Sequence, residues 1–159
     1  MIDVVLADYL NPLHATALVE LLDAYARDPA GGGTPLTAAV RAELPAALAA
    51  RSQAFSVIAF DGAQPVGLVN CIEGFSTFAC RPLVNVHDVV VLASHRGHRI
   101  AQRMLARVEE EALVRGACKL TLEVLQGNAS ALRAYAREGF AGYVLDPSFG
   151  AAVFLQKKL

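Results

Sequence analysis

The chain has 159 residues with a formal net charge of -1, and 55% of its residues are hydrophobic against 18% that are charged. This length fits a single domain over residues 1–159, and the high apolar content favours a sheet that is buried on both faces. The charge balance argues against nucleic acid as a partner, and the lack of a secretion signal or a long apolar run favours a cytoplasmic protein without membrane contact.

The first half of the chain is predicted to form a strand, two helices and three further strands. Asn11 followed by Pro12 marks a helix start, because Asn caps the first turn and Pro suits the first helical position. Pro45 lies within the second helical segment and predicts a kink or a break there. The Asp61-Gly62 step favours a tight hairpin turn. The expected strands are 2–7, 55–60, 65–75 and 83–92, and the expected helices are 12–26 and 36–51.

The second half is predicted to alternate between helices and strands. Apolar residues from Ile100 to Ala112 recur with the period of an amphipathic helix, and Gly116 is placed to end it. Another helix is expected from Asn128 to about Glu138. The remaining predicted strands are 119–125, 140–144 and 151–156. This order predicts an α/β (α+β) fold, with a mixed, twisted sheet of about seven strands and about four helices on both faces.

The segment from Val89 to Ala101 carries the most informative chemistry. A buried strand turns there into an amphipathic helix, whose first amide groups lack partners within the helix. These amides and the positive end of the helix dipole form a site for an anion. The basic side chains clustered around the turn suit a polyphosphate, and they are His95, Arg96, His98, Arg99, Arg103 and Arg107. An ordinary strand-to-helix turn with solvated arginines is the alternative interpretation.

Other phosphate-binding and metal-binding motifs are missing from the sequence. There is no Gly-x-x-x-x-Gly-Lys-Ser/Thr segment, and no Gly-x-Gly-x-x-Gly follows the first strand, which argues against a P-loop and a dinucleotide fold. Cys71, Cys80 and Cys118 are too scattered for a Cys-x-x-Cys pair. We therefore expect no metal site and three reduced thiols.

Two segments together resemble the signatures of the GNAT acetyltransferase superfamily. The run Arg96-Gly97-His98-Arg99-Ile100-Ala101 is similar to the Gln/Arg-x-x-Gly-x-Gly/Ala motif with which that family holds the pyrophosphate of acetyl-CoA. A later segment resembles the second signature, because Asn128 stands at a helix start and is followed by Tyr135, Gly139 and Phe140. The two segments occur in the family's order and on matching elements.

One position departs from the first signature, because Arg99 stands where the family has glycine. A residue other than glycine held at positive φ costs about 1–2 kcal/mol. Either the loop keeps an ordinary helical φ at Arg99, or this residue offsets the strain by contacting phosphate itself.

The resemblance implies direct transfer of an acetyl group from acetyl-CoA to a primary amine of a small molecule or peptide, within a ternary complex. The cofactor contacts that it implies are Val89, Val90, Val91, Arg96, Gly97, His98, Arg99, Ile100, Ala101, Gln102 and Asn128. Among these, the Val91 N–H is expected to face the thioester oxygen. Family habit and apolar composition predict a homodimer. An inactive acyl-CoA sensor and an unrelated nucleotide-binding domain are the alternatives.

Three residues are candidates for proton transfer or charge. The resemblance matches Tyr135 to the tyrosine that many members use as general acid. The alternative for Tyr135 is a core aromatic residue. For Asn128, the alternative to cofactor binding is a simple N-cap. His87 and Asp88 interrupt an apolar strand, and adjacent strand residues point to opposite faces, so only one is expected to face the acceptor. His87 is the preferred base or water holder, whereas Asp88 would attract a cationic amine.

The acceptor site of the family corresponds to the connection between the first two helices, here residues 25–36. By this resemblance, Asp28 would pair with an ammonium group and Tyr25 would pack on its alkyl part. A solvated turn that caps the helix accounts for both residues equally well.

Overall fold

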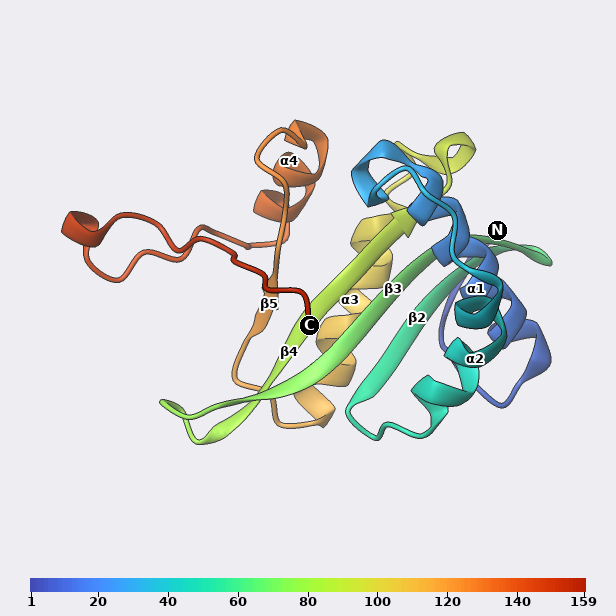
Figure 1. Ribbon diagram of the computed structural model, residues 1–159, viewed down its shortest axis with the longest axis horizontal. Coiled ribbons are helices and arrows are strands. Elements are labelled where there is room, and N and C mark those ends of the chain that lie inside the picture. Colours follow the sequence, from blue (N-terminus) through green and yellow to red (C-terminus); the bar gives the residue numbers. More distant parts are fainter. The chain divides into compact units, whose positions relative to one another are not determined.

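The computed structural model describes residues 1–159, and its contacts divide the chain into two units, Met1–Leu122 and Glu123–Leu159. The first unit holds one sheet with strands in chain order (Figure 1). These strands are β1 (Ile2–Leu6), β2 (Ala54–Asp61), β3 (Gln64–Ser76), β4 (Arg81–Val91) and β5 (Leu120–Leu122). The first four pair antiparallel and β5 pairs parallel with β4, so the predicted mixed sheet is confirmed.

The helices also follow the predicted order. The first unit contains α1 (Pro12–Arg27), α2 (Ala38–Ala49) and α3 (Ile100–Val114), and the second contains α4 (Ala129–Arg137). None of these helices combines the length and the apolar character that crossing a bilayer requires. The mixed α/β fold expected from the sequence is therefore confirmed, with four α-helices.

The sheet of the first unit is covered on both faces. Leu18 of α1 packs with Leu68 of β3 and Val90 of β4, and α2 packs against the same cluster, so we call this side the α1 face. On the other side, α3 approaches β3 so closely that a Cβ at Gly67 would lie 2.9 Å from the Met104 Cε atom. Since Gly67 and Leu68 are neighbours in a strand, these two contacts are on opposite faces.

The strands predicted at 140–144 and 151–156 are wrong. Neither segment joins a β-ladder, and one backbone hydrogen bond, from the Ala152 N–H to the Tyr143 carbonyl at 3.4 Å, connects them. The side chains of Val153, Phe154 and Leu155 are exposed. An alternating apolar pattern forms a stable strand only when one face is buried, and two isolated strands are marginal in water. The sheet therefore has five strands instead of about seven.

Most helix ends carry the signals seen in the sequence. The Asn11 Oδ1 atom accepts a hydrogen bond from the Leu13 N–H at 2.9 Å, and Gly116 follows α3 with a φ of 73°. Of the kink or break predicted at Pro45, the break does not occur, because α2 continues through this residue. Pro45 leaves the Arg41 carbonyl without its helical donor. Arg41 is exposed, so water can supply that hydrogen bond.

Asp23 ties α1 to the segment that leads into α2. Its carboxylate is buried and accepts hydrogen bonds from Arg27 Nε at 2.8 Å, Arg41 Nη1 at 2.9 Å and the Leu36 N–H at 2.9 Å. The hydrogen bond from Arg27 is the main cause that lowers the pKa of Asp23, and burial opposes it. This network anchors both ends of the connection between α1 and α2.

Asp23→Asn is expected to lower the Tm by several degrees at pH 7, because two arginines lose their charged partner. The folded-state pKa of Asp23 lies below its ordinary value of 3.8. Its contribution to stability is therefore complete above that value and is lost as the pH falls through the folded pKa. Thermal denaturation at several pH values should show the difference in Tm shrinking in acid. A difference that is independent of pH would contradict this role, and Asp3→Asn, at an exposed position of β1, is the control.

Candidate active site

The turn between β4 and α3 has the backbone shape expected of an anion site. Gly97 and Arg99 both adopt positive φ, of 85° and 59°. Arg99 is the N-cap of α3, but its side chain makes no capping hydrogen bond, so the first amides of α3 receive no acceptor from it. Of the two alternatives at Arg99, the ordinary helical φ is therefore wrong. The turn keeps the conformation that glycine favours, at a cost of about 1–2 kcal/mol.

Arg96 connects this turn to two other parts of the predicted site. Its Nε atom donates to the Val91 carbonyl at 3.1 Å, and its Nη2 atom donates to Asp28 Oδ2 at 3.2 Å. A hydrogen bond from the Ala30 N–H, followed by the one from Arg96, lowers the pKa of Asp28. The Arg96 side chain is largely exposed, so this ion pair is weak and the guanidinium can exchange its partner for a phosphate.

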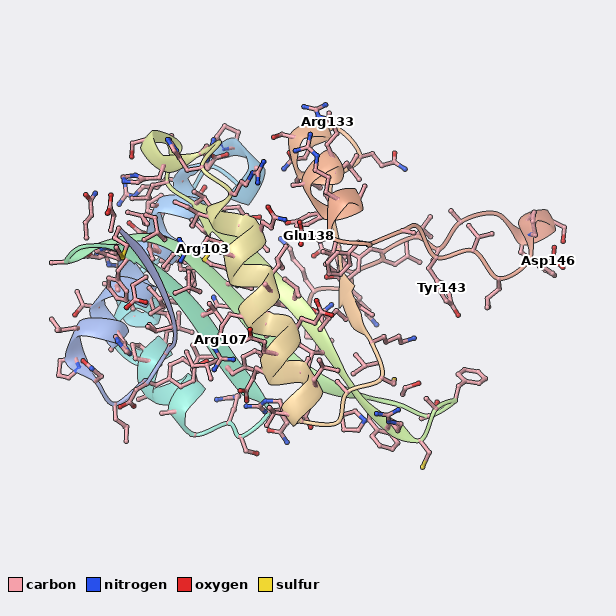
Figure 2. All side chains as sticks on the ribbon, turned by 180° about the vertical axis from the view of Figure 1, so that it is seen from behind. Arg103, Arg107, Arg133, Glu138, Tyr143 and Asp146 are labelled. Atoms are coloured by element: carbon pink, nitrogen blue, oxygen red, sulfur yellow. The ribbon has the colours of Figure 1, made fainter.

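The other basic residues of the predicted cluster have different surroundings. The His98 Nδ1 atom lies 3.2 Å from the His95 carbonyl, within the turn. Arg103 donates to the Ile2 carbonyl at 2.9 Å, and Arg107, one turn further along α3, pairs with a glutamate of its own helix (Figure 2). Arg103 and Arg107 thus bind other parts of the first unit, and the turn itself retains His95, Arg96, His98 and Arg99.

The β4 strand has an open edge beyond Val86. The β5 strand pairs only with Val84–Val86, whereas Val89–Val91 pair with β3 alone. Backbone N–H and C=O groups on this side of residues 87–91 are therefore outside any ladder. An edge of this kind binds an extended chain through its backbone. It is the place where the resemblance puts the pantetheine arm of the cofactor.

A β-bulge places His87 and Asp88 on the same face of the sheet. Asn70 of β3 pairs with Asp88, but the next residue of β3 pairs with Val86, so His87 is an extra residue in β4. Asp88 contacts Asn70, and His87 contacts Asn85, and both of these partners lie on the α1 face. The expectation that these two side chains point to opposite faces is therefore wrong, because strict alternation fails at a bulge.

The hydrogen bonds of His87 favour a tautomer that can accept a proton. Asn85 Nδ2 donates to Thr121 Oγ1 at 3.1 Å, so Asn85 Oδ1 faces His87 Nδ1 at 3.0 Å. Because this oxygen only accepts, Nδ1 carries the hydrogen and Nε2 is the unprotonated nitrogen of the neutral ring. The His87 side chain is exposed, so Nε2 can receive a proton from a bound amine or from water.

Two buried polar residues behind Asp88 were not found from the sequence. Ser56 of β2 and Asn70 of β3 are 1% and 7% exposed. Ser56 Oγ donates to Asn70 Oδ1 at 2.6 Å, and Asn70 Nδ2 donates to Asp88 Oδ2 at 3.0 Å. The Tyr9 hydroxyl lies 2.9 Å from Ser56 Oγ. The available signal was one polar residue inside each of two apolar runs, 54–60 and 65–72, which implies a buried partner.

Tyr25, near the end of α1, lies close to the predicted acceptor residues. Burial raises the pKa of Tyr25, and the negative charges of Asp88 and Asp28 raise it further. Asp28 Oδ1 caps the following 3-10 turn by accepting from the Ala30 N–H at 2.9 Å. Asp28 thus has the capping role that was its alternative interpretation, and it also faces Arg96. The first unit therefore brings Tyr25, Asp28, His87, Asp88 and the β4–α3 turn together.

Asn128 and Tyr135 belong to the second unit. Asn128 is the N-cap of α4, and its Oδ1 atom accepts from the Ala131 N–H at 3.1 Å, which confirms its capping role. The Tyr135 ring makes an edge contact with Phe140, with the ring centroids 6.0 Å apart. The roles of Asn128 in cofactor binding and of Tyr135 as an acid stay predictions.

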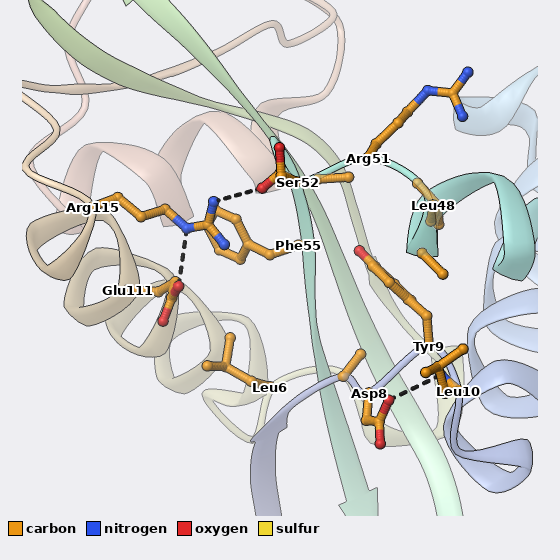
Figure 3. Close-up of a pocket in the computed structure, with 13 residues that line it drawn as sticks. Leu6, Asp8, Tyr9, Leu10, Leu48, Arg51, Ser52, Phe55, Glu111 and Arg115 are labelled. Atoms are coloured by element: carbon orange, nitrogen blue, oxygen red, sulfur yellow. Dashed lines mark hydrogen bonds and ion pairs between the residues drawn. The ribbon is translucent and has the colours of Figure 1, made fainter.

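A separate cavity of about 430 Å³ lies between α2, α3 and the loop that joins β1 to α1 (Figure 3). Arg115 forms one side of it, with Nε 2.9 Å from Glu111, Nη1 3.1 Å from Glu73 and the guanidinium 4.6 Å from the Phe55 ring centroid. Tyr9 lies on the other side. None of the predicted site residues lines this cavity, and Arg115 already binds two carboxylates, so we interpret this wall as structural.

Comparison with known proteins gives both a family and a related fold. Residues 20–140 match the model of the acetyltransferase (GNAT) family. Streptothricin acetyltransferase from Streptomyces lavendulae is 36% identical over 84 residues, which are 51% of this chain and 44% of that protein. The match thus spans less than half the length of this curated relative.

Solved structures extend the similarity to the whole chain. A transcriptional regulator from Bacillus halodurans C-125 has a TM-score of 0.81 at 16% identity and covers 100% of both chains. An aminoglycoside acetyltransferase from an uncultured soil metagenomic sample, in complex with trehalose, has a TM-score of 0.80 at 12% identity and covers 99% of this chain and 96% of its own. At such identities the likeness shows the fold alone. Because the family model matches well over half of the residues of this chain, the chain belongs to the acetyltransferase (GNAT) family.

Proposed function

We propose that this protein transfers an acetyl group from acetyl-CoA to a primary amine of a small molecule. The observation that carries the proposal is the Arg96 side chain, which joins the anion-binding turn, the open edge of β4 and the acidic residue Asp28 within one unit. The family model spans parts of both units, which supports a single domain over the whole chain. The homodimer and the cytoplasmic location stay predictions.

The residues at the turn fit acetyl-CoA. The amides of Ile100, Ala101 and Gln102 at the start of α3, together with the Arg96 guanidinium, are donors of the kind that a pyrophosphate requires. The open edge of β4 at Val89–Val91 fits an extended arm. No group of three or more His, Cys, Asp or Glu side chains is placed to hold a metal ion. Acetyl-CoA would supply the acetyl group as a reactive thioester.

The residues on the α1 face would prepare the amine. A primary amine has a pKa of about 10.4 and is mostly protonated at neutral pH, so a base must remove its proton before attack. The unprotonated Nε2 of His87 is suited to accept that proton, directly or through water. The negative charges of Asp88 and Asp28 would attract the ammonium form, and the Tyr25 ring would pack on its alkyl part. The names of the relatives, which include streptothricin and aminoglycoside acetyltransferases, favour a small-molecule acceptor.

We infer direct transfer between the two substrates, without an acyl-enzyme. Cys71 is 1% exposed, and burial raises the pKa of its thiol to about 12, so it is not available as a thiolate nucleophile. The amine nitrogen would form the new bond to the acetyl carbon while the thiolate departs. Tyr135 would return a proton to that thiolate, as its match to the family's tyrosine implies.

Arg96→Glu is expected to weaken CoA binding by about 10-fold or more, because the loss of one hydrogen bond between charged groups has about that effect. Calorimetry with CoA is the measurement, and circular dichroism checks that the variant is folded. Arg107→Glu is the matched control, because it makes the same change of charge outside the turn, at a residue of α3 that pairs with Glu110. Equal CoA affinities for the Arg96→Glu variant and the wild type would reject the assignment of the turn.

A further inference from the structure

We propose that Asn70 is a positioning residue, which holds the Asp88 carboxylate in place for the cationic acceptor. The inference rests on the proposed function. It begins with the burial of two polar side chains, Ser56 and Asn70, on the α1 face of adjacent strands. Their neighbours on this face, Ile58 and Leu68, are fully buried in the apolar cluster. A buried polar group destabilises a core unless it is hydrogen-bonded, so these two residues need a purpose that apolar side chains would not serve.

Tyr9, Ser56, Asn70 and Asp88 form a chain of hydrogen bonds, in which each residue donates to the next. The Asp88 carboxylate accepts from Asn70 Nδ2, which leaves Asn70 Oδ1 to accept from Ser56 Oγ. The Ser56 hydroxyl has one hydrogen, and that hydrogen is used at Asn70, so the Tyr9 hydroxyl must donate to Ser56. If the Asn70 amide were flipped, its oxygen would face the Asp88 oxygen with no hydrogen between them. The Asp88 carboxylate, which only accepts, therefore requires Asn70 to present its Nδ2 donor, and Ser56 satisfies the Asn70 oxygen on the other side.

The position of Asp88 explains why its orientation matters. Asp88 is half-buried and follows the bulge residue His87, where the regular ladder with β3 is interrupted. A bulge changes the direction of the side chains next to it, and the hydrogen bond from Asn70 Nδ2 then holds the Asp88 carboxylate. Tyr25, whose pKa is raised by burial and by the negative charges of Asp88 and Asp28, lies near this carboxylate. Asn70 thus directs the Asp88 charge toward the residues that would receive the amine.

The expected consequence is a change in the KM for the amine. Asn70→Leu keeps the approximate size of the side chain but removes the donor, so Asp88 loses its fixed direction. The amine KM should rise by about 10-fold, the effect of losing one hydrogen bond to a charged group. The affinity for CoA should stay at the wild-type value, because the Asn70 side chain bonds to Ser56 and Asp88 and to no residue of the β4–α3 turn. Asn70→Leu alone leaves the buried Ser56 hydroxyl without its acceptor, so adding Ser56→Ala removes that unpaired group and should recover part of the lost stability.

The experiment measures amine-dependent release of CoA, followed with a thiol reagent, for spermidine, sisomicin, lysine and a peptide with a free N-terminus. Asn70→Leu, the Ser56→Ala/Asn70→Leu pair, Asp88→Asn and the Asp88→Asn/Asn70→Leu pair are compared with the wild type. Val69→Ala, a buried change on the same strand but on the opposite face, is the control for simple destabilisation. Calorimetry with CoA and thermal denaturation accompany each variant.

If Asn70 acts through Asp88, Asn70→Leu raises the amine KM when it is made in the wild type. The Asp88→Asn/Asn70→Leu pair then has the same amine KM as Asp88→Asn alone. An unchanged amine KM in Asn70→Leu, or an equal rise in both backgrounds, overturns the inference and leaves the proposed function intact. If Asn70→Leu does not fold, the amine KM of the Ser56→Ala/Asn70→Leu pair is compared with that of the wild type instead, and an unchanged KM again overturns the inference. A wild-type protein that acetylates none of these amines overturns the proposed function and this inference together.

Discussion

Gly31→Ala is expected to lower kcat/KM for the amine by about 10- to 100-fold with little change in CoA affinity. A Cβ atom at residue 31 would lie 2.0 Å from the Tyr25 carbonyl oxygen and 3.2 Å from the Ala26 Cα. Backbone atoms cannot move aside as a flexible side chain can, so the 3-10 turn must shift by about 1 Å away from α1. A misplacement of that size near a bound substrate costs up to about 100-fold in rate. Steady-state kinetics with varied amine, and calorimetry with CoA, measure the two effects.

Gly33→Ala provides the control for this change. Gly33, unlike Gly31, has a positive φ, of 76°, and a Cβ there meets nothing within 4 Å. An alanine at this position adds backbone strain without displacing the turn, and kcat/KM should remain near the wild-type value. Wild-type kinetics in Gly31→Ala with every amine would show that the turn carrying Asp28 does not form part of the acceptor site.

Tyr135→Phe is expected to lower kcat by about 10-fold or more, because general acid catalysis contributes typically 10² to 10⁴-fold and a thiolate with a pKa near 8.5 leaves partly unaided. The ring that contacts Phe140 is retained, so the CoA affinity should not change, and thermal denaturation checks that the variant is folded at the temperature of the assay. Single-turnover kinetics establish that the chemical step is rate-limiting before kcat is compared.

Tyr143→Phe is the matched control, since it removes the same hydroxyl group from an exposed tyrosine in the same unit. Its kcat should equal that of the wild type. If Tyr135→Phe also keeps the wild-type kcat while chemistry is rate-limiting, Tyr135 is not the acid and solvent protonates the thiolate.

Local patterns were sufficient to predict most of the elements. The apolar period from Ile100 to Ala112 gave α3, and the Asn11-Pro12 pair gave the start of α1, because both signals act within one or two turns. The alternating residues near the C-terminus have the same local pattern as a strand, but pairing and burial decide whether such a segment joins a sheet. The predicted strands at 140–144 and 151–156 failed for this reason.

The arrangement of the site depends on contacts between distant segments. The bulge at His87 follows from the register between β3 and β4, so strict alternation could not reveal that His87 and Asp88 share a face. The hydrogen bonds that link Ser56, Asn70 and Asp88 cross three strands. Each of these residues, taken alone, looks like an isolated polar residue in an apolar strand. The Arg96–Asp28 pair joins positions 68 residues apart, which a reading of separate motifs cannot connect.

The most direct test of the central claim is acetyl transfer by the purified wild-type chain. Acetyl-CoA is incubated with the four amines named above, free CoA is measured with a thiol reagent, and the acetylated amine is identified by mass spectrometry. The proposed function predicts CoA release that depends on the amine and equals the amount of N-acetylated product, together with stabilisation of the fold by CoA. Stabilisation by CoA without acetylated product from any amine would contradict the enzyme assignment and indicate an acyl-CoA sensor.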